Sequence, residues 1–215
     1  MDVMGAKISR PSVGPVVSTR YTSLSEETVV VRRRPHVVNG GGFVVTDCKQ
    51  DVIFRVYGCG VLGAKGKLLL KNGDGADLLL IHKRGGMLQA MNMIHKKWEG
   101  YEYDNEGSQR LVFTLKDPKD SCLVKTGSIR ISVYGKPKTG IFESGYVEIE
   151  GSFPDRDCRI VDSDGRTLAQ VGIKKEMVGS KKDLYQVIVK PKVDKAFIIG
   201  LISILDYIHG ESTIC

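Results

Sequence analysis

The sequence predicts a mainly β protein, a closed antiparallel barrel of roughly twelve strands around a buried C-terminal α-helix. Two observations carry this prediction. Four pairs of apolar runs are joined by short turns, most of them rich in Asp, Asn and Gly, which is the pattern of β-hairpins. The one long helical stretch, Asp194–Ile208, is apolar on nearly every side and comes last.

The stretch Asp194–Ile208 is expected to be a core helix. Apart from Gly200 and Ser203, its central ten residues are all apolar. A helix that is apolar all round lies in a protein core or in a membrane. A membrane span needs about 20 mostly apolar residues, and this run is shorter. We therefore favour the core, with Asp194 as the N-cap and Gly210 as the stop.

The strands are expected to follow one another as hairpins and single alternating runs. The paired runs are Phe43–Asp47 with Val52–Val56, Lys67–Lys71 with Leu78–Ile81, Trp98–Tyr103 with Leu111–Leu115, and Cys158–Asp162 with Thr167–Ile173. Apolar and polar residues also alternate over 129–134, 147–150 and 185–189. Closing so many strands into a barrel removes exposed sheet edges. Such a barrel is too wide for its own side chains to fill, so the apolar helix is the expected plug.

Residues 1–39 show no periodicity and are expected to form a flexible basic tail, with 40–215 as the folded domain. A short strand at Thr28–Val31 is the one element expected in the tail. The triplet Arg32–Arg34 fits a localisation or lipid signal, but such signals usually hold 5–8 basic residues. An exposed basic spot is therefore the favoured interpretation.

Composition points to an intracellular chain with acidic partners. The net charge is +7, which suits phosphate head groups or nucleic acid and also serves solubility. The five cysteines are odd in number, widely spaced and without a CxxC pair, as in a reduced protein. The N-terminus lacks the apolar core of a signal peptide. We expect a monomeric cytoplasmic protein, with the nucleus or the plasma membrane periphery as alternatives.

Four stretches resemble the plant LURP-one-related family, whose fold is similar to the tubby C-terminal domain and the phospholipid scramblases. They are Gly41–Gly58, Lys96–Tyr103, Cys158–Val171 and, most specifically, Val187–Asp206. The resemblance covers about residues 40–207 and implies a twelve-stranded barrel around a hydrophobic C-terminal helix. It also implies a role in plant defence, and scramblases are associated with calcium.

Motifs for catalysis, cofactors and metals have weak support. Gly58–Gly63 fits GxGxxG, but a dinucleotide site needs a helix there and another strand is expected next. The turns starting at Asn72 and Asp162 resemble calcium loops, yet Lys83 and Ile173 stand where each loop needs its bidentate Glu. The four histidines are scattered. We expect no enzyme activity, no cofactor and no metal.

Basic clusters are the remaining candidates for a binding site. They are His82–Arg84, His95–Lys97, Lys174–Lys175 and Lys181–Lys182, and their places at strand ends allow them to converge on one barrel rim. A basic rim would attract phosphoinositide head groups. The candidate residues are Lys83, Arg84, Lys96 and Lys97. Ordinary solvated lysines are an equally good interpretation.

Three functions remain open. The leading hypothesis is a non-enzymatic LURP-one-related protein that binds phosphoinositides or acts as a membrane-tethered regulator. The alternative is a scramblase-like protein whose C-terminal helix inserts in the bilayer. DNA binding is the least favoured, because no helix or ribbon is seen that would present Arg side chains to base edges.

Overall fold

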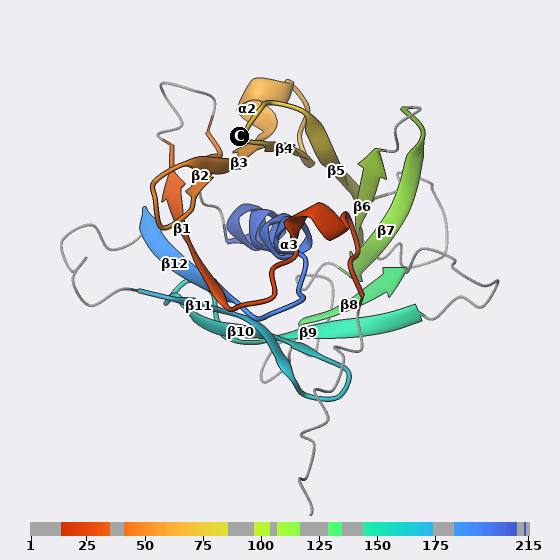
Figure 1. Cartoon of the computed structure of the whole chain (residues 1–215). Helices are drawn as coiled ribbons and strands as arrows, with labels where there is room; N and C mark the ends of the chain where they lie inside the picture. The colour runs from red at the N-terminus through yellow and green to blue at the C-terminus, as the bar shows by residue number, and fades with distance from the viewer. Residues whose placement is uncertain are drawn as a thin grey trace, which may run out of the picture.

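The computed structural model describes residues 14–34, 41–85, 97–103, 107–116, 129–134, 144–173, 183–209 and 213. Within these residues, twelve antiparallel strands form one closed barrel, and a single long helix runs along its interior (Figure 1). The predicted fold class is confirmed. Each strand pairs with its neighbours in sequence, and β1 closes the barrel against β12.

The strands are β1 Glu27–Arg33, β2 Phe43–Thr46, β3 Val52–Tyr57, β4 Lys67–Asn72, β5 Asp77–Arg84, β6 Lys97–Tyr103, β7 Gln109–Lys116, β8 Ile129–Tyr134, β9 Ser144–Ser152, β10 Asp157–Asp162, β11 Thr167–Gly172 and β12 Leu184–Val189. The helical elements are the 3-10 turn η1 Thr19–Tyr21, the single turn α2 Cys59–Leu62 and the long helix α3 Lys195–Ile208. All four predicted hairpins are present. Alternating burial along β4, β5 and β12 confirms that one face of these strands is turned inward.

The helix α3 fills the barrel, as its all-round apolar surface predicts. All but two of its fourteen residues, Lys195 and Tyr207, are buried. Phe197 packs edge-on against Phe113 of β7, and Tyr207 packs edge-on against Trp98 of β6. Asp194 is the N-cap, as expected. The C-cap is His209, and the predicted stop, Gly210, lies outside the described residues.

Glycines allow α3 to approach β5, β6 and β7 closely. A Cβ atom at Gly200 of α3 would lie 2.5 Å from Leu79 Cδ2. A Cβ atom at Gly100 of β6 would lie 2.3 Å from Phe113 Cε1, and that ring is fully buried against Phe197. The absence of a Cβ atom at Gly100 and Gly200 therefore sets the distance between the helix and this part of the sheet.

We expect Gly100→Ala to destabilise the protein by about 1–3 kcal/mol, because the added methyl group would overpack a ring that has little room to move. The measurement is the urea midpoint of unfolding followed by circular dichroism. Gly172→Ala is the matched control. It also lies on a strand, but the nearest atom to its added Cβ beyond its chain neighbours, Gln186 Nε2, is 4.0 Å away. Equal midpoints for the two variants would contradict the close-packing account.

Part of the predicted tail is a strand of the barrel. The stretch Glu27–Arg33, placed in the flexible tail by the sequence, is the barrel strand β1 and pairs with both β2 and β12. Its hydrogen bonds to two partner strands explain its place in the barrel, and the expected strand Thr28–Val31 lies within it. Arg33 contacts the carboxylates of Asp183 and the fully buried Asp206, at 3.2 and 3.5 Å.

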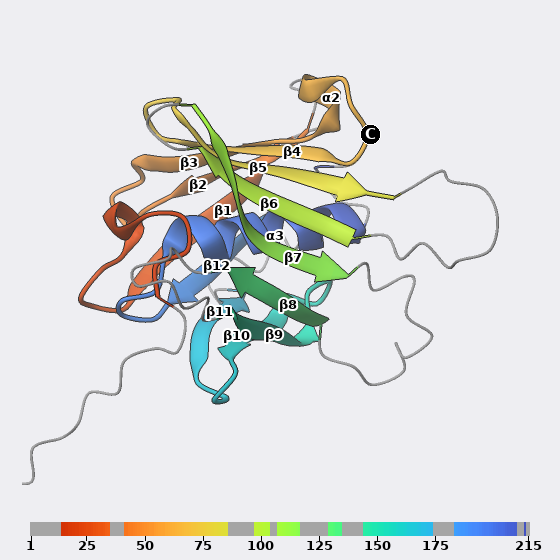
Figure 2. The ribbon, with the colours of Figure 1, turned by 90° about the vertical axis from the view of Figure 1, so that its right-hand side faces the viewer.

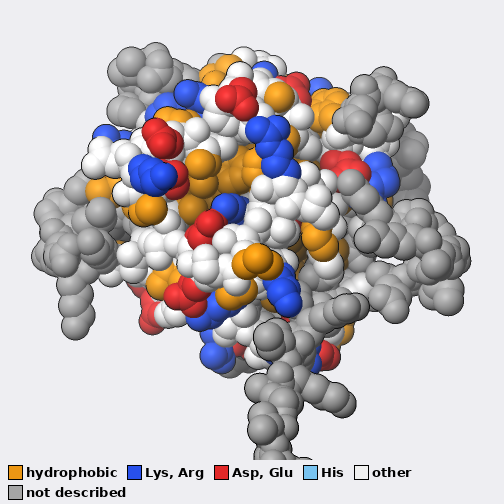
Figure 3. Space-filling model, in the orientation of Figure 1, with side chains coloured by type: hydrophobic (Ala, Val, Ile, Leu, Met, Phe, Trp, Pro, Cys, Tyr) orange, Lys and Arg blue, Asp and Glu red, His pale blue; other side chains and the backbone are white. Residues whose placement is uncertain are grey.

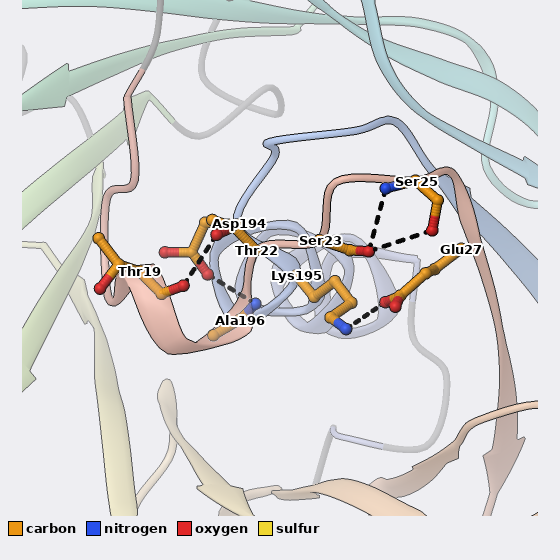
Figure 4. A network of polar contacts seen from close by, with 8 residues as sticks. All are labelled: Thr19, Thr22, Ser23, Ser25, Glu27, Asp194, Lys195 and Ala196. Atoms are coloured by element: carbon orange, nitrogen blue, oxygen red, sulfur yellow. Dashed lines mark hydrogen bonds and ion pairs between the residues drawn. The ribbon is translucent and has the colours of Figure 1, made fainter.

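Residues 14–26, here called the strap, close one end of the barrel. Val16 and Val17 are buried in the core, and the Tyr21 ring lies 5.1 Å from the ring of Phe54. The strap is held by Asp194, whose Oδ2 accepts hydrogen bonds from the backbone N–H groups of Val17 and Ser18 at 2.7 and 2.9 Å. Figure 4 shows this carboxylate at the N-terminus of α3, beside the ion pair of Lys195 and Glu27.

The barrel has two distinct ends, because α3 begins beside the strap at one end and finishes at the other end (Figure 2). At the strap end, acidic and basic side chains are interspersed with apolar ones (Figure 3). All odd-numbered strands begin at the strap end and finish at the opposite end. The latter is called the basic end below.

Candidate anion-binding site

The basic end gathers cationic side chains from several strands. Among the described ones are Arg33, Arg34, Lys65, Lys67, Lys83, Arg84, Lys97, Lys116 and Arg130. They come together because β1, β3, β5 and β7 finish there, and β4, β6 and β8 begin there. Strands β11 and β12 also meet at this end. The clusters Lys174–Lys175 and Lys181–Lys182, which lie between these two strands in sequence, are outside the described residues.

Three of the four predicted site residues are described, and they do not share one face. Arg84 and Lys97 are direct register partners on the outer face of β5 and β6. Lys83 lies on the inner face with its own partner Trp98, and its Nζ is 5.7 Å from the centroid of that indole ring. Lys96 is outside the described residues. The sequence therefore named one cluster where the structure has an outer pair and an inner lysine.

Glu99 and Tyr101 of β6 complete the outer pair. Glu99 Oε1 lies 2.7 Å from Lys97 Nζ, and Glu99 Oε2 accepts hydrogen bonds from Arg84 Nε at 3.0 Å and from the Tyr101 hydroxyl at 2.7 Å. The Glu99 side chain is 8% exposed, against 63% for Arg84 and 50% for Lys97. The carboxylate is thus the buried member of the cluster, and the two cations are its exposed members.

The pKa values follow from these contacts. Burial opposes ionisation of Glu99, but the hydrogen bonds from Lys97 and Tyr101 and the positive charges of Lys97 and Arg84 together outweigh it and hold the pKa of the carboxyl below its usual value. The same hydrogen bonds raise the pKa of Lys97 and that of Tyr101. The cluster is therefore a carboxylate, two cations and a neutral phenol at physiological pH.

His82 borders the cluster without joining it. Its ring packs edge-on against Tyr101, with centroids 5.9 Å apart. Burial, followed by the positive charges of Lys67 and Arg84, lowers the pKa of this histidine. A neutral imidazole here neither competes with Arg84 for Glu99 nor adds to the positive charge of the basic end.

Sequence reasoning missed Glu99 and Tyr101 as members of the site. The signal that was available is the alternation in Lys97–Tyr103, which puts Lys97, Glu99 and Tyr101 on one face of a strand. The pairing of that face with Arg84 depends on the β5–β6 register, and the segment between these strands gives no turn motif that fixes a register.

The motifs weighed against enzymes and metals behave as structural turns. Asp162 Oδ1 accepts hydrogen bonds from the backbone N–H groups of Asp164 and Arg166, and Asn72 Oδ1 accepts one from Ala76. The GxGxxG stretch forms the single helical turn α2, after which β4 pairs antiparallel with β3. The described residues hold no group of three or more His, Cys, Asp or Glu side chains placed to bind a metal ion.

Among the described residues, no helix has the length and apolar character required to cross a membrane.

Comparison with known proteins finds one family. The model of the LURP-one-related family matches residues 27–206, from the first residue of β1 to the last turn of α3. Protein LURP-one-related 16 of Arabidopsis thaliana is 67% identical over 99% of this chain and all of its own length. Protein LURP-one-related 6 is 59% identical over 93% of this chain and 98% of its own length, and Protein LURP1 is 26% identical over 88% and 87%, both from the same plant. No solved structure matches.

Proposed function

The chain belongs to the LURP-one-related family, and from that premise we propose that it is a non-enzymatic regulator that attaches to membranes by binding phosphoinositide head groups at its basic end. The observation that carries this proposal is the topology, which brings cations from strands far apart in sequence to one end of a rigid barrel. Phosphoinositides carry several phosphate oxygens that Lys and Arg bind through charge and hydrogen bonds.

Lys83, Arg84 and Lys97 are the described residues that we assign to head-group contact. Each basic side chain near an anionic membrane surface contributes about 1 kcal/mol to attachment. Several cations on one end therefore suffice for reversible attachment, without a lipid anchor or a membrane span. We place the protein in the cytoplasm, with a fraction at the plasma membrane.

The test is sedimentation of the full chain with phosphatidylcholine vesicles at physiological salt, with and without a minor fraction of phosphatidylinositol bisphosphate. We expect phosphoinositide-dependent pelleting, weakened about tenfold or more by Lys83→Gln/Arg84→Gln/Lys97→Gln. The matched control, Lys49→Gln/Lys190→Gln/Lys192→Gln, removes the same charge from the strap end. Wild-type protein that stays in the supernatant on phosphoinositide vesicles would rule the proposal out.

The scramblase-like alternative has less support. Bilayer insertion would expose the apolar surface of α3, which the barrel covers on all sides. The barrel would have to open and lose that core. Alkaline carbonate extraction separates the two ideas, because an inserted protein stays in the membrane pellet and a peripheral one is released. Nucleic acid is also disfavoured as a partner, since the long helix among the described residues is enclosed.

We extend the proposal to plant defence on family resemblance alone. The contribution would be regulatory, through recruitment to a membrane whose phosphoinositide content changes. Pathogen growth on plants lacking the gene, compared with plants complemented by the wild type or by the triple basic-end variant, tests it. Equal pathogen growth with and without the gene would remove defence from the proposal.

A further inference from the structure

The Glu99 cluster has the chemistry of an occupied anion site. Arg84 Nε, Lys97 Nζ and the Tyr101 hydroxyl all point at one carboxylate, within 3.0 Å. All three are donors, and two of them are cations, so the cluster without Glu99 would present two positive charges and a hydroxyl to one small volume. A phosphate group is bound well by several charge-assisted hydrogen-bond donors of this kind.

We propose that Glu99 is a resident anion in a phosphate-binding site, and that a phosphomonoester displaces its carboxylate from Arg84 and Lys97. The inference rests on the proposed function, because it assigns the contact through which the basic end would recognise a head group. It changes the role of the cluster: Arg84 and Lys97 are cations already engaged by an internal competitor, and Glu99 sets the threshold for binding.

Glu99 and Glu150 are both outer-face carboxylates, and they differ in what surrounds them. Glu150 of β9, three strands away, contacts Arg159 of β10 at 2.6 Å in an ordinary cross-strand pair. Its side chain is 38% exposed, and no lysine or tyrosine is recorded against it among the described residues. Such a pair is typical of a solvated sheet surface. The buried Glu99 carboxylate with three donors is therefore not explained by sheet pairing alone.

Displacement is chemically reasonable for a phosphorylated lipid. A phosphomonoester carries about −1.5 to −2 charges and three strong acceptor oxygens, against one charge and two oxygens for Glu99. The internal carboxylate has the advantage of an effective concentration of about millimolar or more. A dilute free phosphate would therefore compete poorly. A membrane that offers many head groups at once, together with the other cations of the basic end, would compete well.

The test compares full-length wild type, Glu99→Gln and Glu150→Gln on vesicles containing phosphatidylinositol bisphosphate. Each variant loses one negative charge from the outer face of a barrel strand. We expect Glu99→Gln to bind about tenfold more tightly than wild type, because the lost contact is a charge-assisted one. We expect Glu150→Gln to stay within about threefold of wild type. Adding Arg84→Gln and Lys97→Gln to Glu99→Gln should abolish the gain.

Two further arms identify the source of the phosphate. Vesicles with phosphatidylserine at equal total charge measure attraction without a phosphomonoester. Inorganic phosphate is then added to Glu99→Gln bound to phosphoinositide vesicles. Release by inorganic phosphate supports a site for phosphate itself, and resistance to it supports a site for the lipid head group. An equal gain on phosphatidylserine vesicles would overturn the inference, because general charge would then explain it.

The outcomes separate this inference from the proposed function. If wild type binds phosphoinositide vesicles and Glu99→Gln binds no better than Glu150→Gln, the resident-anion site is wrong and the function stands. If only Glu99→Gln binds, the site stands and the function proposed for the natural chain falls. If neither binds, both fall.

Glu99→Asp is a second variant that keeps the inference testable if Glu99→Gln has a folding defect. It keeps the charge and withdraws the carboxylate by one methylene from Arg84 and Lys97. We expect it to bind phosphoinositide vesicles more tightly than wild type, by a smaller factor than Glu99→Gln. Folding of each variant is checked by its thermal unfolding midpoint. Binding by Glu99→Asp equal to wild type would contradict displacement of the carboxylate.

Discussion

Replacing Leu201 by aspartate is expected to abolish soluble folding. Leu201 lies in the middle of α3 and is fully buried. Loss of its contacts alone would cost about 2–5 kcal/mol, and an unpaired carboxylate in that core adds a larger desolvation cost. The sum equals or exceeds the roughly 5–15 kcal/mol that stabilises a typical domain. The measurement is soluble yield followed by circular dichroism of whatever is recovered.

Leu24→Asp is the matched control for this prediction. The chemical change is the same, but Leu24 lies in the strap and is 88% exposed. The Leu24→Asp protein should keep the wild-type yield, and its free energy of unfolding should lie within about 0.5 kcal/mol of the wild-type value. Leu201→Met tests the shape of the same site and should cost less than about 1.5 kcal/mol. A soluble Leu201→Asp protein with cooperative unfolding would show that α3 is not the core around which the barrel forms.

The fold was predictable because its signals are local. Alternation along a strand such as Leu184–Val189 shows which residues face inward, and the all-round apolar surface of α3 needs no knowledge of its partners. The place of β1 in the barrel was not predicted, for the opposite reason: the sequence indicated only a short strand, Thr28–Val31, within a tail. Arg33 reads as part of a basic tail until its partners Asp183 and Asp206 are known, and these lie 150 or more residues away.

The candidate site was only partly predictable. Lys83 and Arg84 are adjacent, so the sequence places them in one cluster, yet successive residues of a strand face opposite sides. Period-two alternation could have separated them. The convergence of Arg84 on Glu99 could not be found this way, since it depends on a register between strands joined by a segment whose sequence contains no turn motif that fixes a register.

The strap shows what a buried polar residue can organise over a long sequence distance. We expect Asp194→Ala to destabilise the protein by about 3–5 kcal/mol, the sum of a lost helix cap and of backbone donors left unpaired. Asp194 Oδ1 accepts hydrogen bonds from Ala196 N and Phe197 N, at 2.9 and 3.4 Å, while Oδ2 holds the two strap amides. Burial raises the pKa of this carboxyl, and the four N–H donors partly offset that rise. Urea unfolding measures the loss.

Two companion variants test this account. Asp47→Ala is the exposed control, and Asp194→Asn separates the helix cap from the strap. Asp47 accepts hydrogen bonds from Lys49 N and Asp51 N in an exposed turn, where water can replace it, so Asp47→Ala should cost about 1 kcal/mol or less. Asp194→Asn keeps an acceptor for α3 but turns an NH₂ group toward donors in the strap. Hydrogen exchange should then quicken at Val17 and Ser18 while the first turn of α3 stays protected. Equal urea midpoints for Asp194→Ala and Asp47→Ala would contradict this account. The strap would then be held in place by the burial of Val16 and Val17 and not by the Asp194 carboxylate.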